Sequence, residues 1–206
     1  MLADDDTTKI LTSPRRAVTR WVALGQIGFA AGIGLCVISS PHLVLHANEG
    51  GISNFGVHAK TVAPYTAALL LPAALTFRAS RLIAAHSPQR RLREILTVYS
   101  GLILLTLLTT YLYKVDTPLK IVHVGVGVVL TVFEMGTSLW MCREIRALYG
   151  VVILEFVGFV LAALTIVGVL HLLFVTQLVV GAAFAVILVR ACRVLISPTR
   201  PSPTSA

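Results

Sequence analysis

Six long apolar runs constrain this chain more than any other feature, because each is long enough to cross a lipid bilayer. An α-helix rises 1.5 Å per residue, so about 20 apolar residues span the hydrocarbon core. The runs lack the alternation of apolar and polar residues that marks the strands of a membrane β-barrel. The sequence therefore predicts an all-α, polytopic membrane protein, a bundle of six transmembrane helices. The predicted spans are residues 21–40, 62–83, 95–113, 119–141, 150–170 and 172–195.

The composition excludes a soluble globular domain. Hydrophobic residues make up 56% of the 206 residues and charged residues only 13%, whereas about a quarter of a soluble domain is charged. The formal net charge of +8 does not indicate nucleic-acid binding, because basic residues in a membrane protein mark its cytoplasmic side. We therefore expect membrane lipids, or another membrane protein, as partners, and no nucleic acid.

The lysines and arginines predict how the bundle is oriented. If the N-terminus lies in the cytoplasm, all but three of the 17 basic residues fall in cytoplasmic segments. The three on the outer side are Lys60, Lys114 and Lys120. This bias predicts that both termini are cytoplasmic. We also expect the protein to lie in a plasma membrane, the inner membrane of a bacterium.

The two ends of the chain are polar and rich in Ser, Thr or Pro, which is typical of disorder. We expect residues 1–20 and 196–206 to be disordered cytoplasmic segments around a transmembrane domain of residues 21–195. The basic flank of the first run is also typical of a signal peptide. However, the run is longer than a signal core and no A-x-A cleavage site follows it, so we expect an uncleaved span.

The second and third spans are joined by a basic cytoplasmic connection, AAHSPQRRLRE. Its arginines either only set the topology or also contact anionic lipid headgroups, to which each basic residue near the surface contributes about 1 kcal/mol. Setting the topology is the favoured interpretation.

The longest outer connection, residues 41–60, contains the polar stretch HANEGGISNFGVHAK. It carries His42, His46 and His58, and a zinc site would need three or four such ligands that converge. His42 and His46 have the i,i+4 spacing of neighbours on a helix, but nothing in the sequence predicts a helix here. Hydrated or hydrogen-bonded histidines are the favoured interpretation, and metal binding and proton sensing stay as alternatives. We expect no cofactor.

An acidic residue inside a predicted span is a functional candidate, because a charge is costly in the hydrocarbon core. Glu134 lies in the fourth span, about 21 Å along the helix axis from Lys120. His123 is eleven residues before Glu134, which is about 1100° of helical rotation, so the two lie within about 20° of each other. We expect this face of the helix to look into the bundle.

The third span carries a second polar stripe at helical spacing. Such a stripe either forms hydrogen bonds between helices or lines a cavity open to the outside. The stripe consists of Tyr99, Thr106, Thr109, Thr110 and Tyr113. In the cavity alternative, Tyr113 and His123 lie near the mouth.

Two further patterns predict contacts between spans. Glu155 and Arg190 have similar predicted depths in the fifth and sixth spans, which favours an ion pair at the inner boundary. The alternative is that Arg190 alone extends to the cytoplasm. Gly28 and Gly32 form a G-x-x-x-G motif, which lets helices approach closely and which we interpret as packing within the chain.

Motifs of common enzyme classes are missing from the sequence. It contains no P-loop, no G-x-S-x-G and no H-E-x-x-H. A transmembrane haem site would need paired histidines inside the spans, and only His123 comes near to that position. We therefore expect a protein that is not an enzyme.

A short motif in the outer loop and a histidine in the fourth span suggest a family. The residues that carry the likeness are Ile52, Ser53, Asn54 and Gly56, then Pro64 and Tyr65, then His123 with Gly125 and Gly127. With six spans, the chain resembles the DRAM-like membrane proteins, which are autophagy modulators and organisers of plasma-membrane lipid, and a related group of uncharacterised bacterial six-span proteins. It departs from that pattern at Asn54, where an aspartate is usual, and at Gly51, where a proline often stands.

The resemblance implies a non-enzymatic integral membrane protein that is associated with lipid organisation or envelope traffic. It also implies that the ISNFG turn and His123 lie on the same outer side, close enough to touch. Gly56 is expected to permit a positive φ in that turn.

These observations lead to three functional hypotheses. The favoured one is a protein that binds lipid or a membrane partner through an outward-facing pocket and helps to organise the membrane or envelope. The pocket would include Asn54, Tyr113, His123 and Glu134. The first alternative is a small proton-coupled carrier with Glu134 as its proton site. The second is a metal-dependent membrane enzyme.

Overall fold

The computed structural model describes residues 14–85, 89–111 and 117–196. These residues form helices and connections and no strand. Six of the helices are long and apolar enough to cross a membrane, which confirms the predicted six-helix bundle. The six are α1 (Pro14–Ser39), α3 (Val62–Arg81), α4 (Arg90–Thr110), α5 (Thr117–Glu144), α6 (Tyr149–Ile166) and α7 (Leu173–Leu195). Three short helices complete the fold: α2 (Leu43–Gly50), η2 (Ile52–Val57) and η3 (Arg146–Leu148).

Several helices begin or end away from the predicted limits of the spans. The first helix begins at Pro14, so residues 14–20 are helical and not part of a disordered flank, and α4 begins at Arg90. Basic residues occupy both early turns. Arginine is a good helix former and its stem lies along apolar surface, so a helix continues past the point where hydrophobicity alone predicts its end. At its C-terminal end α6 stops at Ile166, shortly before Gly168, which has a φ of 81°.

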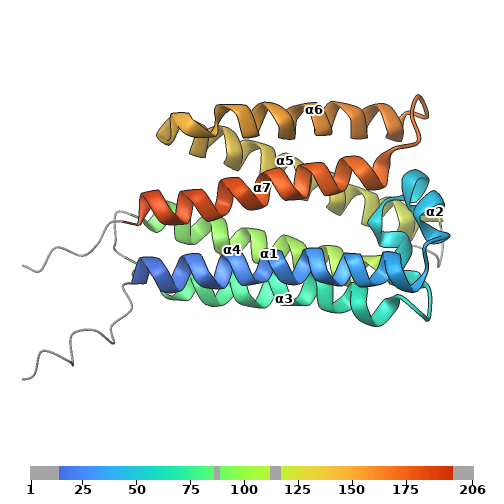
Figure 1. Cartoon of the computed structure of the whole chain (residues 1–206), viewed down its shortest axis with the longest axis horizontal. Helices are drawn as coiled ribbons and strands as arrows, with labels where there is room; N and C mark the ends of the chain where they lie inside the picture. Colours follow the sequence, from blue (N-terminus) through green and yellow to red (C-terminus); the bar gives the residue numbers. More distant parts are fainter. Residues whose placement is uncertain (1–13, 86–88, 112–116, 197–206) are drawn as a thin grey trace, which may run out of the picture.

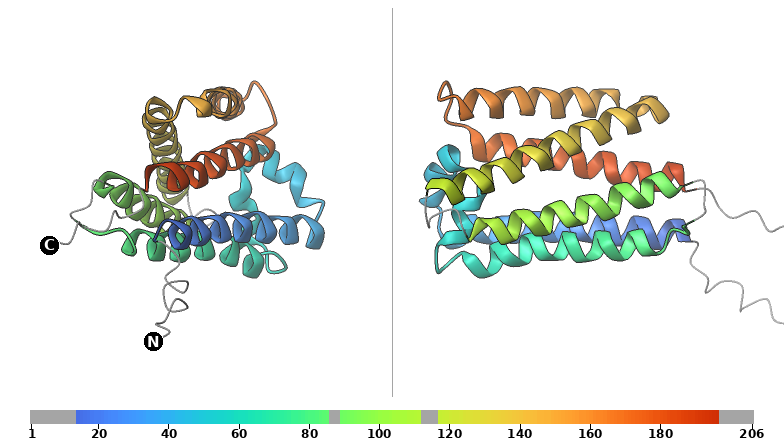
Figure 2. Two further views of the ribbon diagram at one scale, coloured as in Figure 1. Left: turned by 60° about the vertical axis from the view of Figure 1, so that its left-hand side comes forward. Right: turned by 180° about the vertical axis from the view of Figure 1, so that it is seen from behind.

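The six long helices run roughly side by side (Figure 1). One group consists of α1, α3 and α4, with α3 packed between the other two. In the second group α7 packs on α6 and also on α1, and α5 bridges α4 to α6 (Figure 2). The beginning of α1 and the end of α7 lie at the same end of the bundle, called here the termini end. The short helices α2 and η2 lie at the opposite, loop end.

Glycines on α1 allow it to lie directly against α3. A Cβ atom at Gly32 would be 2.6 Å from Cβ of Ala68 and 2.9 Å from the carbonyl oxygen of Pro64, and one at Gly25 would be 3.0 Å from Cα of Pro72. Any side chain at Gly32 would therefore push the two helices apart. The G-x-x-x-G motif is thus used for packing within the chain, as the sequence predicts.

Two arginine–tryptophan contacts mark the termini end. The guanidinium of Arg78 lies 4.3 Å from the centre of the Trp21 ring, and that of Arg91 lies 4.6 Å from the centre of the Trp140 ring. Both are within the range of a cation–π interaction. Tryptophan is enriched at membrane–water interfaces, so these contacts indicate the depth at which the termini end meets the interface.

Candidate functional site

The loop between α1 and α3 folds into a compact cap on the loop end of α7. The backbone N–H of Ile52 donates a hydrogen bond of 2.8 Å to Oε1 of Gln177, and the ring of Phe55 stands edge-on to that of Phe174 at 5.7 Å between centres. Gly51 has a φ of 78°, which proline cannot adopt because its ring holds φ near −65°. The turn therefore excludes the proline that often stands at this position in the DRAM-like proteins.

Ser53 connects the cap to the interior of the bundle. Its Oγ lies 2.7 Å from Nε2 of His123, and Nδ1 of the same ring lies 3.0 Å from Oγ1 of Thr109. The side chains of Ser53, His123 and Thr109 are all buried. The resemblance implies that the ISNFG turn and His123 are close enough to touch, and the structure brings them into direct contact.

The neighbouring bonds assign the protons of this network. The hydroxyl of Thr109 donates to the carbonyl oxygen of Leu105 at 2.9 Å, so its oxygen accepts a hydrogen bond from Nδ1–H of His123. In a neutral imidazole Nε2 is then an acceptor, and the hydroxyl of Ser53 donates to it. Serine in η2, histidine in α5 and threonine in α4 thus form one directed chain of hydrogen bonds.

Tyr65 of α3 extends the network on the other side of the cap. Its hydroxyl lies 2.9 Å from Oγ1 of Thr110 and 3.5 Å from Oγ of Ser53. Thr110 donates its own proton to the carbonyl oxygen of Thr106 at 2.8 Å, so Tyr65 is the donor in the shorter contact. Ser53 thus ties the cap to α5 by a hydrogen bond, and Tyr65 joins α3 to α4 directly beside it.

Gly56 is needed in this cap for space and not for its backbone angle. A Cβ atom at Gly56 would be 2.5 Å from Cγ2 of Thr110 and 2.6 Å from Cε1 of Tyr65. Among the described glycines only Gly51 and Gly168 have positive φ. The expectation of a positive φ at Gly56 is therefore wrong, and close approach is the physical reason for the glycine.

The three candidate pocket residues that the structure describes do not converge in one place. The side chain of Asn54 turns away from the network and donates a hydrogen bond of 2.8 Å to the carbonyl oxygen of His46 at an exposed position. His123 and Glu134 share the buried face of α5, but eleven residues of helix separate them by about 16 Å. Tyr113 lies outside the described residues. The outward-facing pocket stays a prediction.

The loop histidines lie on or beside a helix that was not expected. His46 belongs to α2, and His42 directly precedes it. Within the part of the chain that the structure describes, no three His, Cys, Asp or Glu side chains come close enough to hold a metal ion. The three cysteines Cys36, Cys142 and Cys192 are buried free thiols.

Glu134 and Glu155 form a second candidate site, in the interior of the bundle. Their side chains are only 8% and 0% exposed, and the two carboxyl groups are near enough to interact electrostatically. Neither oxygen of Glu155 has a hydrogen-bond partner, although Oγ of Ser138 lies beside it without good bonding geometry. Tyr99 of α4 lies within electrostatic range of both carboxyl groups and close to Gln26 of α1. The site therefore joins four helices and holds two acidic groups.

The expected ion pair between Glu155 and Arg190 is not formed. Between described residues, the structure contains one ion pair, Arg90 with Glu94. The position of Gly158 against Val180 gives the reason, because a Cβ there would be 2.9 Å from Cγ2 of that valine. Since α6 and α7 run antiparallel, Glu155 is level with about residue 183 of α7, which leaves Arg190 about 10 Å further along the axis.

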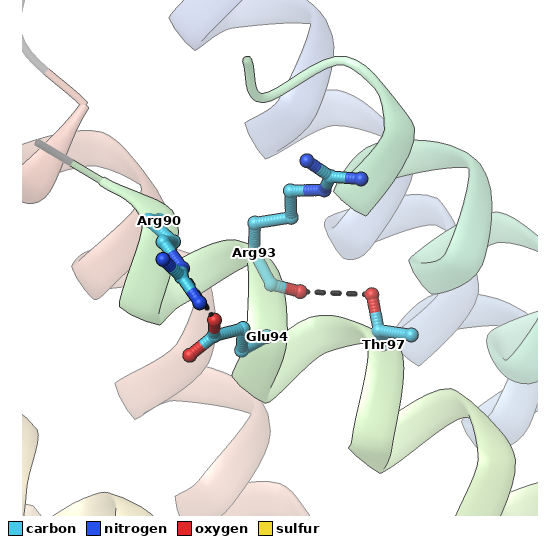
Figure 3. Close-up of polar contacts among 4 residues, drawn as sticks. All are labelled: Arg90, Arg93, Glu94 and Thr97. Carbon is cyan, nitrogen blue, oxygen red and sulfur yellow. Dashed lines mark hydrogen bonds and ion pairs between the residues drawn. The ribbon is translucent and has the colours of Figure 1, made fainter. Parts of the chain in front are cut away.

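A third feature is a hollow of about 430 Å³ at the termini end, where α4 begins. Nε of Arg90 lies 2.7 Å from Oε1 of Glu94, one turn along the helix (Figure 3). The hydroxyl of Thr97 donates to the carbonyl oxygen of Arg93 at 2.9 Å. The described lining residues are Ala85, Arg90, Arg93, Glu94, Thr97 and Val98. The basic connection before α4 is visible in the sequence and indicates where positive charge gathers. The hollow itself depends on how α3 and α4 pack, which the sequence does not predict.

Comparisons with protein-family models, with curated proteins and with solved structures found no match for this chain. The likeness to the DRAM-like proteins therefore stays a prediction from the residues that carry it. The chain is an integral membrane protein of six spanning helices, and its further function is argued from its own geometry.

Proposed function

We propose that this membrane protein is a small proton-linked carrier in which Glu134 and Glu155 form the proton-binding site. The observation that carries the proposal is the burial of two carboxyl groups on the packed spanning helices α5 and α6, without a hydrogen bond to either oxygen of Glu155. Acidic residues inside membrane spans commonly serve in proton relays and substrate pathways.

A purely structural role explains this pair poorly. An unpaired buried carboxylate lowers the stability of a fold by several kcal/mol. Buried acids in stable folds are therefore normally paired with a cation or fully hydrogen-bonded. Neither condition is met for Glu155, since no described Arg, Lys or His forms an ion pair with it. Taking up a proton removes the charge, so the site is suited to exchange protons when its surroundings change.

Buried polar groups continue from the acid pair toward the loop end. On α4, Tyr99 beside the pair is followed by Thr106, Thr109 and Thr110, all of them buried. Thr109 is in turn bonded to His123. This row of groups supports a route for protons between the acid pair and the loop end, which the topology of the basic residues places outside.

The proposal is tested by pH-jump currents on proteoliposomes adsorbed to a solid-supported membrane. We expect the wild-type protein to give a transient charge displacement that E134Q and E155Q each remove. Glutamine keeps the shape of a protonated glutamate, so a merely structural acid would tolerate this change. E144Q makes the same substitution at an exposed position at the end of α5 and is the matched control. Equal currents from wild type, E134Q and E155Q would overturn the proposal.

Infrared difference spectra between two pH values provide a second readout of the same site. The carbonyl stretch of a protonated carboxyl group should change with pH in the wild type, and E155Q should remove part of that change. A spectrum that E134Q and E155Q both leave unaltered would also contradict a proton site at this pair.

Membrane organisation through bound lipid is the second candidate, as the resemblance to the DRAM-like proteins implies. The observation that favours it is the basic hollow at the termini end, where both arginines lie at the surface of α4. No described group of ligands supports the metal-dependent enzyme.

A further inference from the structure

The hollow at the beginning of α4 combines charge, shape and depth in a way that the acid pair does not explain. Its described lining includes two arginines, one glutamate, a threonine and two small apolar side chains. We propose that this hollow binds the headgroup phosphate of an anionic phospholipid, with an acyl chain lying along α4. The inference is independent of the proton-linked function.

The depth of the hollow suits a headgroup. Arg91, the neighbour of Arg90, lies over Trp140, and Arg78 at the end of α3 lies over Trp21. The hollow therefore lies level with two tryptophans of the termini end. Aromatic side chains of this kind are found at the level of lipid headgroups, and the positive-inside bias assigns this end to the cytoplasmic leaflet.

The charges of the hollow suit one phosphodiester group. Glu94 contacts Arg90 through Nε alone, which leaves the two terminal nitrogens of that guanidinium as donors. Arg93 forms no ion pair with a described residue, and Figure 3 shows its guanidinium extending to the other side of α4 from Glu94. The described lining carries a formal net charge of +1, which the single charge of a phosphodiester held by Arg90 would neutralise, while Arg93 adds positive charge from the other side of the helix. Guanidinium groups bind phosphate through two parallel hydrogen bonds.

The apolar wall distinguishes a lipid from free phosphate. Val98 lines the hollow and its side chain is 47% exposed. Leu105 lies two turns further along α4 on the same face, since seven residues return the helix to within about 20°, and it is also exposed, as is Leu108. An acyl chain attached to a phosphate in the hollow would run along this face, whereas inorganic phosphate has no apolar part that could pack against it.

The proposal is tested with the purified, delipidated full-length chain and native mass spectrometry. The protein is titrated with phosphatidylglycerol and, separately, with phosphatidylcholine of the same acyl chains. We expect phosphatidylglycerol to bind at least about tenfold more tightly, which is 1.4 kcal/mol. Both lipids carry the phosphodiester, but phosphatidylcholine also carries a quaternary ammonium, which the net positive charge of the hollow repels. Equal affinity for the two lipids would overturn the proposal.

Paired variants then assign the binding to the hollow. We expect R90Q/R93Q to remove the preference for phosphatidylglycerol, and R143Q/R146Q, which removes two exposed charges at the ends of α5 and η3, to keep it. If both double variants lose the preference equally, the attraction is a general effect of positive charge and the site proposal fails. R90K/R93K keeps the charge without the planar fork and should bind with intermediate affinity, provided that all variants elute and unfold like the wild type.

The source of the phosphate is decided by competition. Inorganic phosphate and glycerol phosphate are added at increasing concentration to the complex with phosphatidylglycerol. We expect neither compound to displace the lipid when its concentration equals that of phosphatidylglycerol, because both lack the acyl chain. Displacement at equal concentration would show a site for free phosphate and would contradict a lipid site. V98N, which makes the apolar wall polar, should weaken the lipid and leave any binding of free phosphate unchanged.

Discussion

The hydroxyl of Ser53, in the cap at the loop end, lies 2.7 Å from Nε2 of His123 in α5. Seventy residues of sequence separate the two, and both side chains are buried. This contact joins the connection between the first two spanning helices to the fourth one. A loop that the sequence marks only as polar is therefore held in one position by the bundle.

Substitution S53A tests this contact. Alanine removes the hydrogen bond that the buried imidazole accepts from the cap, and we expect a loss of about 1–3 kcal/mol in the free energy of unfolding. Proteolysis within residues 41–60 should become faster at the same time. The measurements are thermal unfolding in detergent and limited proteolysis followed by mass spectrometry.

N54A is the matched control in the same turn. The Asn54 side chain bonds the carbonyl oxygen of His46 at an exposed position, so its loss should change stability by no more than about 0.5 kcal/mol. If N54A proved as damaging as S53A, the buried contact with His123 would not be what holds the cap.

A second prediction concerns Gly56. In G56A the new methyl group would meet Thr110 and Tyr65 at about 2.5 Å, and overpacking of this kind costs about 1–3 kcal/mol. G101A makes the same change within α4, where a Cβ atom would meet nothing within 4 Å, and should be neutral or slightly stabilising because alanine favours the helix. Comparison of the two unfolding temperatures measures the effect, and a neutral G56A would contradict the close approach.

A third prediction compares two glycines of α1, of which only Gly32 belongs to the G-x-x-x-G motif. G32A places a methyl group 2.6 Å from Cβ of Ala68, whereas a Cβ atom at Gly34 would meet nothing within 4 Å. We expect G32A to destabilise the protein by about 1–3 kcal/mol and G34A to leave it unchanged or slightly more stable. Unfolding of both variants in the same detergent decides between them. Loss of stability in G34A alone would mean that α1 presents a different face to α3.

These comparisons show what the sequence could and could not predict. Hydrophobicity and length identified the six spanning helices, because each helix must satisfy its own backbone in the membrane. The beginning of α4 at Arg90 was missed since an arginine ends a hydrophobic run but not a helix. The shared inward face of His123 and Glu134 followed from helical geometry alone. That the two residues belong to separate sites could not be predicted, because this depends on which residues of other helices lie beside each of them.

Other features depend on the relative positions of elements that are distant in sequence. Ser53, and not Asn54, reaches His123 because successive side chains of the 3₁₀ helix η2 are about 120° apart and face different directions. No local pattern predicts which of the two points inward. The Glu155–Arg190 pair was expected from similar depths, but the contact of Gly158 with Val180 sets a register that leaves the two apart. Sequence spacing within one helix is informative, whereas the register between two helices is a property of packing.

The last prediction concerns the acid pair and separates function from stability. Neither carboxyl oxygen of Glu155 has a hydrogen-bond partner in a fully buried position, and replacing an unsatisfied buried polar group by an apolar one of similar shape is commonly neutral or stabilising. E155M should therefore keep or raise the unfolding temperature while removing the charge displacement after a pH jump. E155Q should be close to wild type in stability and equally inactive. If Glu155 served only to stabilise the fold, the opposite result would be expected. E155M would then lose about 1–2 kcal/mol or more in the free energy of unfolding, and its current would fall only in proportion to the loss of folded protein. Measuring the current per folded molecule, after size-exclusion chromatography of each variant, distinguishes the two outcomes.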